Sequence, residues 1–348
     1  MSAVALLKKQ QKPSEILRQE GATFFTKSTF EKELSKALDL CKISAPLFVE
    51  SNSGFQDDLN GIEKPISFKG KAIGEGQIYE IVHSLAKWKR FALAQYEVAV
   101  GKGIVTDMRA LRPDEEGLDS LHSMYVDQWD WEKVITASER TLVGLRATVE
   151  KIYSALKATE QALVQSYPEY HAFLPETIHF IHSEELLQLY PSLSRKERED
   201  SICKRYGAVF LIGIGGELPD GTIHDGRAPD YDDWSTPTEA GKLGLNGDII
   251  IWNPILERSF EISSMGIRVD KEALLRQLAI RGVDKRQELP WHQLLLQDKL
   301  PLTMGGGIGQ SRVAMLLMQK AHIGEVQISA WPPSEHEECS RKGIYLLK

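Results

Sequence analysis

GGGIGQSR, residues 305–312, links a proline-containing stretch, LPLTM (300–304), to an apolar run of helical character, VAMLLMQKA (313–321). Three consecutive glycines cost backbone entropy, so a chain keeps them where another group approaches the backbone closely or where φ is positive. Arg312 follows the last glycine by three residues and falls in the first turn of the expected helix. Such an arginine either forms a salt bridge or offers its planar guanidinium to a ligand, and other segments must decide between the two.

Two glycine motifs that bind phosphate do not match. The phosphate loop ends in Gly-Lys-Ser/Thr, whereas this cluster ends in Ser311-Arg312. In AVFLIGIGG (208–216) the dinucleotide fingerprint needs a glycine where Leu218 stands, and the PDG that follows predicts a turn rather than a helix. A bound nucleotide would therefore be held in another way.

The composition is that of an ordinary globular protein and limits the partners. Of the 348 residues, 42% are hydrophobic and 26% are charged, and the net charge of −7 gives no general attraction to nucleic acid or to an anionic membrane. The three cysteines are far apart and form no CxxC pair, which indicates reduced thiols in a cytosolic protein. The first residues lack the features of a signal peptide, and no run approaches the ~20 apolar residues of a membrane span. We therefore expect a cytoplasmic protein with no nucleic-acid partner and no membrane partner.

Hydrophobic periodicity predicts an α+β fold with a largely antiparallel sheet flanked by helices. Ser28 lies three residues before Glu31, a capping-box spacing at the start of a helix over 28–41, and Pro46 ends that pattern. Residues 78–96 begin as a strand and become helical. Further elements are expected as helices over 139–167 and 270–282, a β-hairpin over 103–135, and strands over 208–216, 247–252 and 259–264.

The hairpin carries polar residues that suit an anionic ligand. Arg112, in LRPDE, closes its first strand, and an arginine at a strand end can clamp a phosphate with two hydrogen bonds. The second strand, YVDQWDWE, places Gln128 and Asp130 two residues apart and therefore on one face. A surface salt bridge within the hairpin is the alternative for Arg112.

Together these segments resemble a known family. The arginine, the acidic loop, the Q-x-D pair and the late glycine cluster ending in arginine resemble motifs 2 and 3 of the class II aminoacyl-tRNA synthetases, and the stretch around Pro46 is similar to motif 1, whose proline lies at the dimer interface. Longer segments resemble the ammonia-dependent asparagine synthetases (aspartate–ammonia ligases): HSLAKWKR (83–90), LRPDE (111–115), SLHSMYVDQWDWE (120–132), APDYDDWSTP (228–237), LNGDI (245–249), FEISSMGIR (260–268) and GGGIGQSR.

The resemblance runs from about residue 22 to 333 and implies a single catalytic domain with a class II synthetase-like core. Residues 1–21 would then be an N-terminal extension and 334–348 a C-terminal tail. The implied enzyme is a homodimer that uses ATP and Mg²⁺ to join ammonia to L-aspartate, giving L-asparagine, AMP and pyrophosphate through a β-aspartyl-adenylate. Free ammonia agrees with the sequence, because a glutamine-dependent enzyme needs an activated thiol and Cys41 lies on an apolar helix.

The resemblance also implies which residues hold ATP. Arg112 would bridge the α-phosphate and the reacting carboxylate, and Arg312 would lie against adenine or the triphosphate. Gly307 belongs to the glycines that admit the nucleotide. Asp248 and Glu261 match acids that face the metal, and their hard oxygen atoms suit Mg²⁺. The alternative for this pair is a set of solvated acids on a hairpin.

For aspartate, the resemblance implies a pocket with charges of both signs. Lys89 and Arg268 match the pair that grips a carboxylate, and because the side chain is the activated group here, we expect them to hold the α-carboxylate. Asp130 and Gln128 match residues around the amino group. Ser264 is expected to add a hydroxyl contact.

Three further residues are candidates with strong alternatives. Asp57, in SGFQDDLNG, matches an acid near the substrate and could draw in ammonium or accept its proton. Asp232, in APDYDDW, is a second candidate for that region, and either aspartate could instead bond its own backbone in a turn. His122, in the motif 2 loop, is a candidate for phosphate contact.

Other histidines are assigned to structure rather than to metal. His179 and His182 lie three apart in a strand-like run, which points them to opposite faces, so we expect packing and hydrogen bonding. HEEC (336–339) could bind a metal, but a solvated tail is the expectation.

Two other functions use the same fold. An aminoacyl-tRNA synthetase paralogue is disfavoured by the net negative charge and by the absence of about 100 further residues for an RNA-binding domain. A non-catalytic regulator that binds nucleotide or amino acid would be expected to lose ATP-site residues, whereas Arg112, Asp248, Glu261 and Arg312 are all present.

Overall fold

The computed structural model describes residues 13–348 except 58, 60–62, 73–75, 114–116 and 239. An eight-stranded sheet forms its centre, in the spatial order β1 (Leu40–Lys42), β5 (Gly103–Leu111), β6 (Tyr125–Val134), β11 (Thr303–Gly309), β10 (Arg258–Ile267), β9 (Asn246–Asn253), β8 (Ala208–Ile212) and β7 (His179–His182). The strands pair antiparallel except at the two edges, where β1 and β5, and β7 and β8, are parallel. The expected α+β fold with a mostly antiparallel sheet is confirmed.

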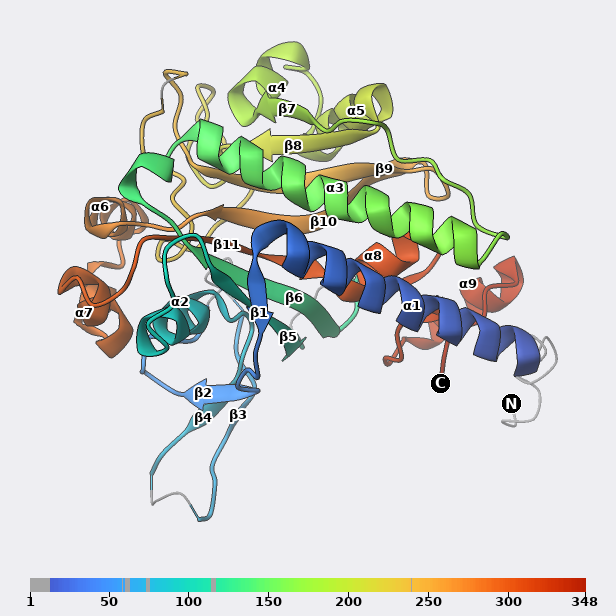
Figure 1. Ribbon diagram of the computed structural model, residues 1–348, viewed down its shortest axis with the longest axis horizontal. Helices are drawn as coiled ribbons and strands as arrows, with labels where there is room; N and C mark the ends of the chain where they lie inside the picture. The colour runs from blue at the N-terminus through green and yellow to red at the C-terminus, as the bar shows by residue number, and fades with distance from the viewer. Residues whose placement is uncertain (1–12, 58, 60–62, 73–75, 114–116, 239) are drawn as a thin grey trace.

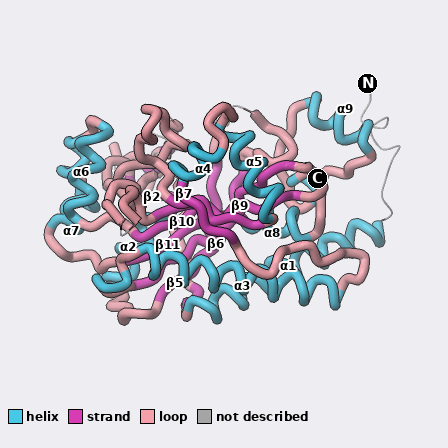
Figure 2. Tube along the Cα trace, turned by 90° about the horizontal axis from the view of Figure 1, so that it is seen from above, coloured by secondary structure: helices cyan, strands magenta, loops and turns pink. Residues whose placement is uncertain are grey.

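Helices cover both faces of this sheet. The long helices α1 (Pro13–Leu38) and α3 (Leu142–Ser166) lie side by side across one face, and α4 (Ser183–Leu189) and α5 (Arg195–Tyr206) lie on the other (Figures 1 and 2). On β6, the ring of Trp129 packs 4.7 Å from that of Phe30 on α1. Because side chains alternate along a strand, Gln128 and Asp130 face away from the long helices.

The long helix α1 begins earlier than the sequence pattern predicted. Ser28 lies inside it and its hydroxyl donates to the carbonyl of Phe25 at 3.1 Å, so the expected capping box is wrong. The reason is a continuous buried face that holds Ala22 together with Phe30 and Leu34. Residues 13–21, placed by the resemblance in an extension, are therefore the first turns of α1.

Most other elements lie where periodicity predicted them. The hairpin of β5 and β6 is confirmed, and the N–H of Arg112 extends its pairing by donating to the carbonyl of Met124 at 2.8 Å. Residues 78–96 form β4 (Tyr79–Ile81) and then α2 (Ala86–Gln95). With β2 (Phe48–Glu50) and β3 (Ser67–Phe68), β4 makes a small separate sheet. The remaining described elements are η2 (Ala137–Glu139), α6 (Lys271–Arg281), η3 (Asp284–Glu288), α7 (Pro290–Leu296), α8 (Gln310–Leu317), η4 (Ile323–Glu325) and α9 (Pro333–Lys342).

The C-terminal residues pack onto the domain. Cys339 on α9 is only 3% exposed, so the expectation of a solvated HEEC segment is wrong for this residue. The N–H of Leu347 donates to the carbonyl of Gly324 at 2.8 Å. His322 and Glu335 lie near Cys339, and the Nε2 of His322 is 3.3 Å from a Glu335 carboxylate oxygen. The segment therefore anchors α9 to η4.

The strand histidines have the structural roles expected of them. His179 stacks on the ring of Tyr206 at a centroid distance of 3.7 Å. The Nδ1 of His182 accepts the N–H of Glu184 at the start of α4, and its Nε2 lies 2.9 Å from the carbonyl of Leu243. Among the described residues, no helix is both long enough and apolar enough to cross a membrane.

Candidate active site

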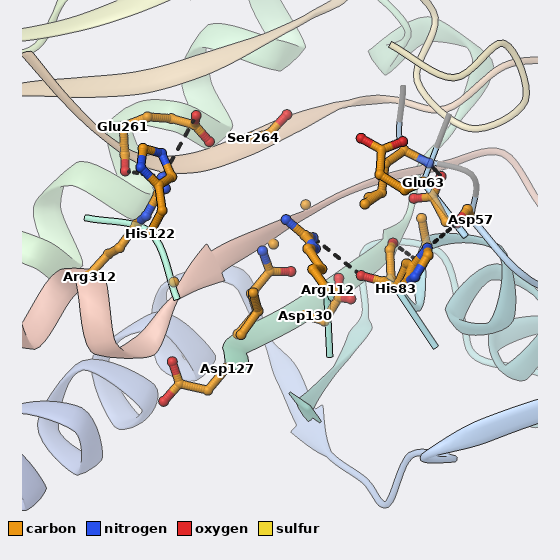
Figure 3. Close-up of a pocket in the computed structure, with 18 of the residues that line it drawn as sticks. Asp57, Glu63, His83, Arg112, His122, Asp127, Asp130, Glu261, Ser264 and Arg312 are labelled. Carbon is orange, nitrogen blue, oxygen red and sulfur yellow. Dashed lines mark hydrogen bonds and ion pairs between the residues drawn. The ribbon is translucent and has the colours of Figure 1, made fainter. Parts of the chain in front are cut away.

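A cavity of about 880 Å³ lies against the sheet on the face that Gln128 and Asp130 share. Of the residues proposed from the sequence, all but Lys89 and Asp248 line it, and Figure 3 shows several of them pointing into it. Five arginines contribute to the lining, namely Arg112, Arg195, Arg227, Arg268 and Arg312. So many fixed cations in one cavity suit a polyanionic ligand.

At one end of the cavity, Arg268 is held by two buried acids. Its Nε and Nη2 donate to the carboxylate of Glu132 at 2.7–3.1 Å, and its Nη1 donates to Asp232 at 2.5 Å. All three side chains are at most 3% exposed. These contacts leave one N–H on each terminal nitrogen of Arg268 for a ligand, because a guanidinium has five donors.

Glu132 was not identified from the sequence. It is fully buried, and although burial alone would raise its pKa, Arg268 and Lys89 outweigh burial and lower the pKa below its ordinary value. For Asp232 burial prevails over Arg268, and the pKa is raised. The signal for Glu132 was present, since it lies two residues beyond Asp130 on the same strand face.

Lys89 lies behind this end of the cavity. Its Nζ donates to the carboxylate of Asp130 and, at 2.9 Å, to the carbonyl of Trp131, and the residue is fully buried. The other Asp130 oxygen accepts the N–H of Leu85 at 3.1 Å. The structure therefore places Lys89 against Asp130, and it is Asp130 that faces the cavity.

The glycines of the cluster make room for side chains of a neighbouring strand. Gly305 and Gly307 lie in β11 rather than in a loop. A Cβ on Gly305 would overlap the carboxylate of Glu132, and one on Gly307 would overlap the amide of Gln128. The close approach that the glycines permit is thus made by these two side chains, of which Gln128 lines the cavity.

At the other end of the cavity, the charged groups are more open. The Nη1 of Arg312 donates to the carbonyl of Glu261 at 3.0 Å and lies 3.8 Å from the Glu261 carboxylate, while its guanidinium carbon sits 5.9 Å from the ring centre of Phe260. Arg112 lies apart from this pair, beside His83 (Figure 3), and its Nη2 donates to the carbonyl of His83 at 3.3 Å. In this structure the salt-bridge alternative holds for Arg312, and its guanidinium still lines the cavity.

Two further residues arrange this open end. The Nδ1 of His122 lies 2.9 Å from a carboxylate oxygen of Asp119, which orients the ring at the rim. Asp127, which the sequence did not single out, accepts the N–H and the hydroxyl of Ser311 at 3.0 and 2.8 Å. A carboxylate at the N-terminus of α8 stabilises that helix end and so positions Arg312 one residue later.

Asp248 and Glu261 lie on β9 and β10, as expected, but their surroundings differ. Both Asp248 oxygens accept hydrogen bonds from the Nη2 of Arg227, at 2.6 and 2.7 Å, and Asp248 is 4% exposed. Burial, opposed by Arg227 and reinforced by Glu261, raises the pKa of Asp248 to about 7. The pair supplies the carboxylate oxygens that Mg²⁺ prefers, on adjacent strands, so the donor set fits this ion, although of the two acids Glu261 alone lines the cavity.

Asp57 lies in a loop that buried groups hold in place. One of its oxygens accepts the N–H of Leu59 at 3.0 Å, which is the turn contact foreseen as an alternative, yet the carboxyl also lines the cavity. The carbonyl of the preceding residue, Gln56, accepts from the Nζ of Lys87 at 2.7 Å, and that lysine pairs with Asp230 at 2.9 Å. Both groups are buried, and the sequence did not reveal them.

The chain matches a known protein family over most of its length. The family model described as aspartate-ammonia ligase matches residues 17–343. The chain belongs to the aspartate–ammonia ligase family. It is therefore an enzyme, a ligase that amidates aspartate to asparagine with the use of ATP.

Solved structures confirm the class II synthetase fold. Asparaginyl-tRNA synthetase from Pyrococcus horikoshii complexed with asparaginyl-adenylate matches with a TM-score of 0.67 at 14% identity, over 93% of this chain and 74% of that one. The Entamoeba histolytica asparaginyl-tRNA synthetase complex with the same adenylate has a TM-score of 0.66 at 12% identity, over 94% and 73%. An aspartyl-tRNA synthetase from Entamoeba histolytica matches with 0.59 at 14% identity, over 96% and 65%. Identities this low show a shared fold.

Proposed function

We propose that this ligase adenylylates the β-carboxylate of aspartate inside the described cavity and then lets ammonia displace AMP. A carboxylate is a poor acyl donor, and attack on the α-phosphate of ATP gives it a good leaving group. The observation that carries the proposal is that Arg112, Arg268 and Arg312 line one cavity. Two of the similar synthetases bind asparaginyl-adenylate, a ligand of the same class.

We assign the nucleotide end of the cavity to Glu261 and Arg312, and the junction with the aspartate end to Arg112. Adenylylation brings two anions together, so fixed cations must face the position where charge develops. Arg112 would contact the α-phosphate and the attacking carboxylate, and Arg312 the adenine or triphosphate, with His122 at the rim and Gly307 in the floor. Asp248 and Glu261 would hold Mg²⁺, which neutralises phosphate charge when bound.

We assign the aspartate end of the cavity to Arg268, Glu132 and Asp232. The two remaining N–H groups of Arg268 suit the α-carboxylate, and the acids around it keep the guanidinium in one orientation. Asp130 and Gln128 would accept the amino group, and Ser264 would add a hydroxyl contact. Lys89 would act through Asp130, because it contacts that carboxylate from behind.

Asp57 is our candidate for drawing ammonium into the cavity or accepting its proton. Its carboxyl faces the cavity and is 2% exposed, so a cation could reach it with little competition from bulk water. Asp232 lies in the same region, but its pairing with Arg268 favours a structural role.

A homodimer in the cytoplasm is also part of the proposal. The support for the dimer is that α1 exposes large apolar side chains, with Phe24 at 76% and Leu17 at 72%. Sedimentation equilibrium of the full chain is expected to give twice the mass of one chain, and a monomer would contradict this part.

The reaction is tested with purified enzyme, ATP, Mg²⁺, aspartate and either ammonium or glutamine, measuring asparagine, AMP and pyrophosphate. We expect equal amounts of all three products with ammonium and no dependence on tRNA. Pyrophosphate release that requires tRNA would favour a synthetase paralogue instead. No release under any condition would favour a non-catalytic regulator.

A further inference from the structure

We infer that Arg227 is a further residue of the ATP site. In the nucleotide-free enzyme it pairs with Asp248. When ATP binds, it moves to the pyrophosphate portion of ATP and leaves the Asp248 carboxylate open to the metal. The inference rests on the proposed function, since it takes Asp248 as a metal ligand. No motif in the sequence singled out Arg227, which lies in the loop between β8 and β9.

Arg227 blocks the path from the cavity to Asp248. Asp248 does not line the cavity, whereas Arg227 does. The Nη2 of Arg227 donates to both carboxylate oxygens, at 2.7 and 2.6 Å, and so covers the edge of the carboxylate that a metal would approach. A metal ion can therefore reach Asp248 from the cavity only if this guanidinium moves.

Arg227 and a metal ion would compete for the carboxylate of Asp248. A guanidinium and a divalent ion that share one carboxylate repel each other strongly where water is scarce. The Arg227 side chain is only 10% exposed and that of Asp248 only 6%. Occupation of Asp248 by Arg227 should therefore weaken metal binding to the enzyme without nucleotide.

Arg227 is anchored by its neighbours and still has one hydrogen-bond donor unused. Its Nη1 is held by Asp225 at 3.2 Å and by the carbonyl of Gly226 at 2.7 Å, and both residues line the cavity. The buried Nε of Arg227 has no hydrogen-bond partner among the described residues. A guanidinium anchored through Nη1, with an unused Nε donor, can exchange its Nη2 contact for phosphate oxygens, which satisfy several N–H groups at once.

Arg195 supplies a matched comparison. It lines the same cavity and pairs with Asp225 as Arg227 does, but none of its described contacts is with Asp248. Replacing it changes the charge of the cavity by the same amount without uncovering Asp248.

The test measures Mn²⁺ binding to the full-length enzyme without nucleotide, by electron paramagnetic resonance of free Mn²⁺. We expect Arg227→Met to bind Mn²⁺ about tenfold or more tightly than the wild type, and Arg227→Lys to show a smaller gain. Arg195→Met should bind as the wild type does, and adding Asp248→Asn to Arg227→Met should abolish the gain. No gain in Arg227→Met, an equal gain in Arg195→Met, or a gain that survives Asp248→Asn would overturn the inference.

A second measurement tests the transfer to phosphate. Calorimetry with inorganic pyrophosphate in the absence of metal should show about tenfold weaker binding to Arg227→Met than to the wild type, with Arg227→Lys between them. If Arg227→Met does not fold, as judged by circular dichroism, Arg227→Lys decides both measurements. Unchanged pyrophosphate binding in the variants overturns the transfer. Asparagine formation by the wild type separates failure of this inference from failure of the proposed function.

Discussion

The two ends of the cavity hold similar charges in different surroundings. At the aspartate end, the side chains of Arg268, Glu132 and Asp232 are at most 3% exposed. At the nucleotide end, the side chain of Arg312 is 27% exposed and that of Glu261 is 41% exposed. Electrostatic interactions are strong and fixed where water is excluded, and weaker and more adjustable where it is not.

This contrast explains how one site can be both selective and able to turn over a large substrate. In the proposed site, a small amino acid would be recognised by groups already locked together before it arrives, which limits the reorganisation that binding requires. A bulky triphosphate would enter through groups that can still change partners. Substitutions at the aspartate end should therefore damage folding and catalysis together, whereas those at the nucleotide end should affect mainly catalysis.

The largest expected effect is at Arg268. Arg268→Met leaves Glu132 and Asp232 buried without their cation and should lower the free energy of unfolding by about 3–5 kcal/mol. Arg268→Lys keeps the charge but not the planar fork, so kcat/KM for aspartate should fall by roughly 10²–10³-fold. Chemical denaturation and steady-state kinetics measure the two effects. Unchanged aspartate affinity in Arg268→Lys would contradict the assignment of Arg268 to the α-carboxylate.

Glu132→Gln tests whether the aspartate end depends on its buried ion pair. The variant should lose about 3 kcal/mol of stability near neutral pH, because Arg268 then keeps only one of its two charged partners, Asp232. The folded-state pKa of Glu132 is below its ordinary 4.5, so its stabilising contribution is complete above that pH and declines as the pH falls through the folded value. The stability difference between wild type and variant, measured by denaturation, should therefore shrink below about pH 4.5. A difference that is constant with pH would show that the charge of Glu132 is not the cause.

At the nucleotide end, Arg312→Met should separate catalysis from stability. We expect kcat/KM for ATP to fall by about 10²-fold because a cation facing the nucleotide is lost. The free energy of unfolding should change by less than ~1 kcal/mol, since the contact with Glu261 is half exposed. A loss of stability as large as that of Arg268→Met would remove the contrast between the two ends.

Two glycines of one strand should have smaller effects on catalysis than the charged residues do. A Cβ on Gly305 overlaps the Glu132 carboxylate, whereas a Cβ on Gly309 meets the flexible side chain of Arg312 at 3.1–3.3 Å. Gly305→Ala should cost about 1–3 kcal/mol of stability and raise KM for aspartate. Gly309→Ala should cost less and act on ATP. Thermal melts and KM values for both substrates check the pair, and equal effects of the two variants would argue against separate ends.

The sequence predicted most of the fold because the relevant signals are local. The β5–β6 hairpin, α3, and the paired strands β9 and β10 follow from alternation and helical spacing within each segment. The start of α1 could not be placed in this way, because the spacing of Ser28 and Glu31 matches a helix N-cap. The structure shows that the buried face of α1 already includes Ala22.

The site was predicted less completely, for a physical reason. Arg112, Glu261 and Arg312 could be carried over from motifs, and they line one cavity. The role of Glu132 depends on its pairing with Arg268, which is 136 residues away in sequence. The role of Arg227 depends on its pairing with Asp248 on β9. The first pairing depends on sheet register and the second on the path of the loop between β8 and β9, and single-segment patterns contain neither.

The central claim is that the side-chain carboxyl of aspartate attacks the α-phosphate of ATP. The most direct measurement uses aspartate labelled with ¹⁸O in its β-carboxyl group, followed by mass spectrometry of the AMP formed in the presence of ammonium. We expect one ¹⁸O atom to be transferred to the phosphate of AMP for each asparagine made. AMP without ¹⁸O, with the label found in pyrophosphate instead, would contradict an adenylate intermediate.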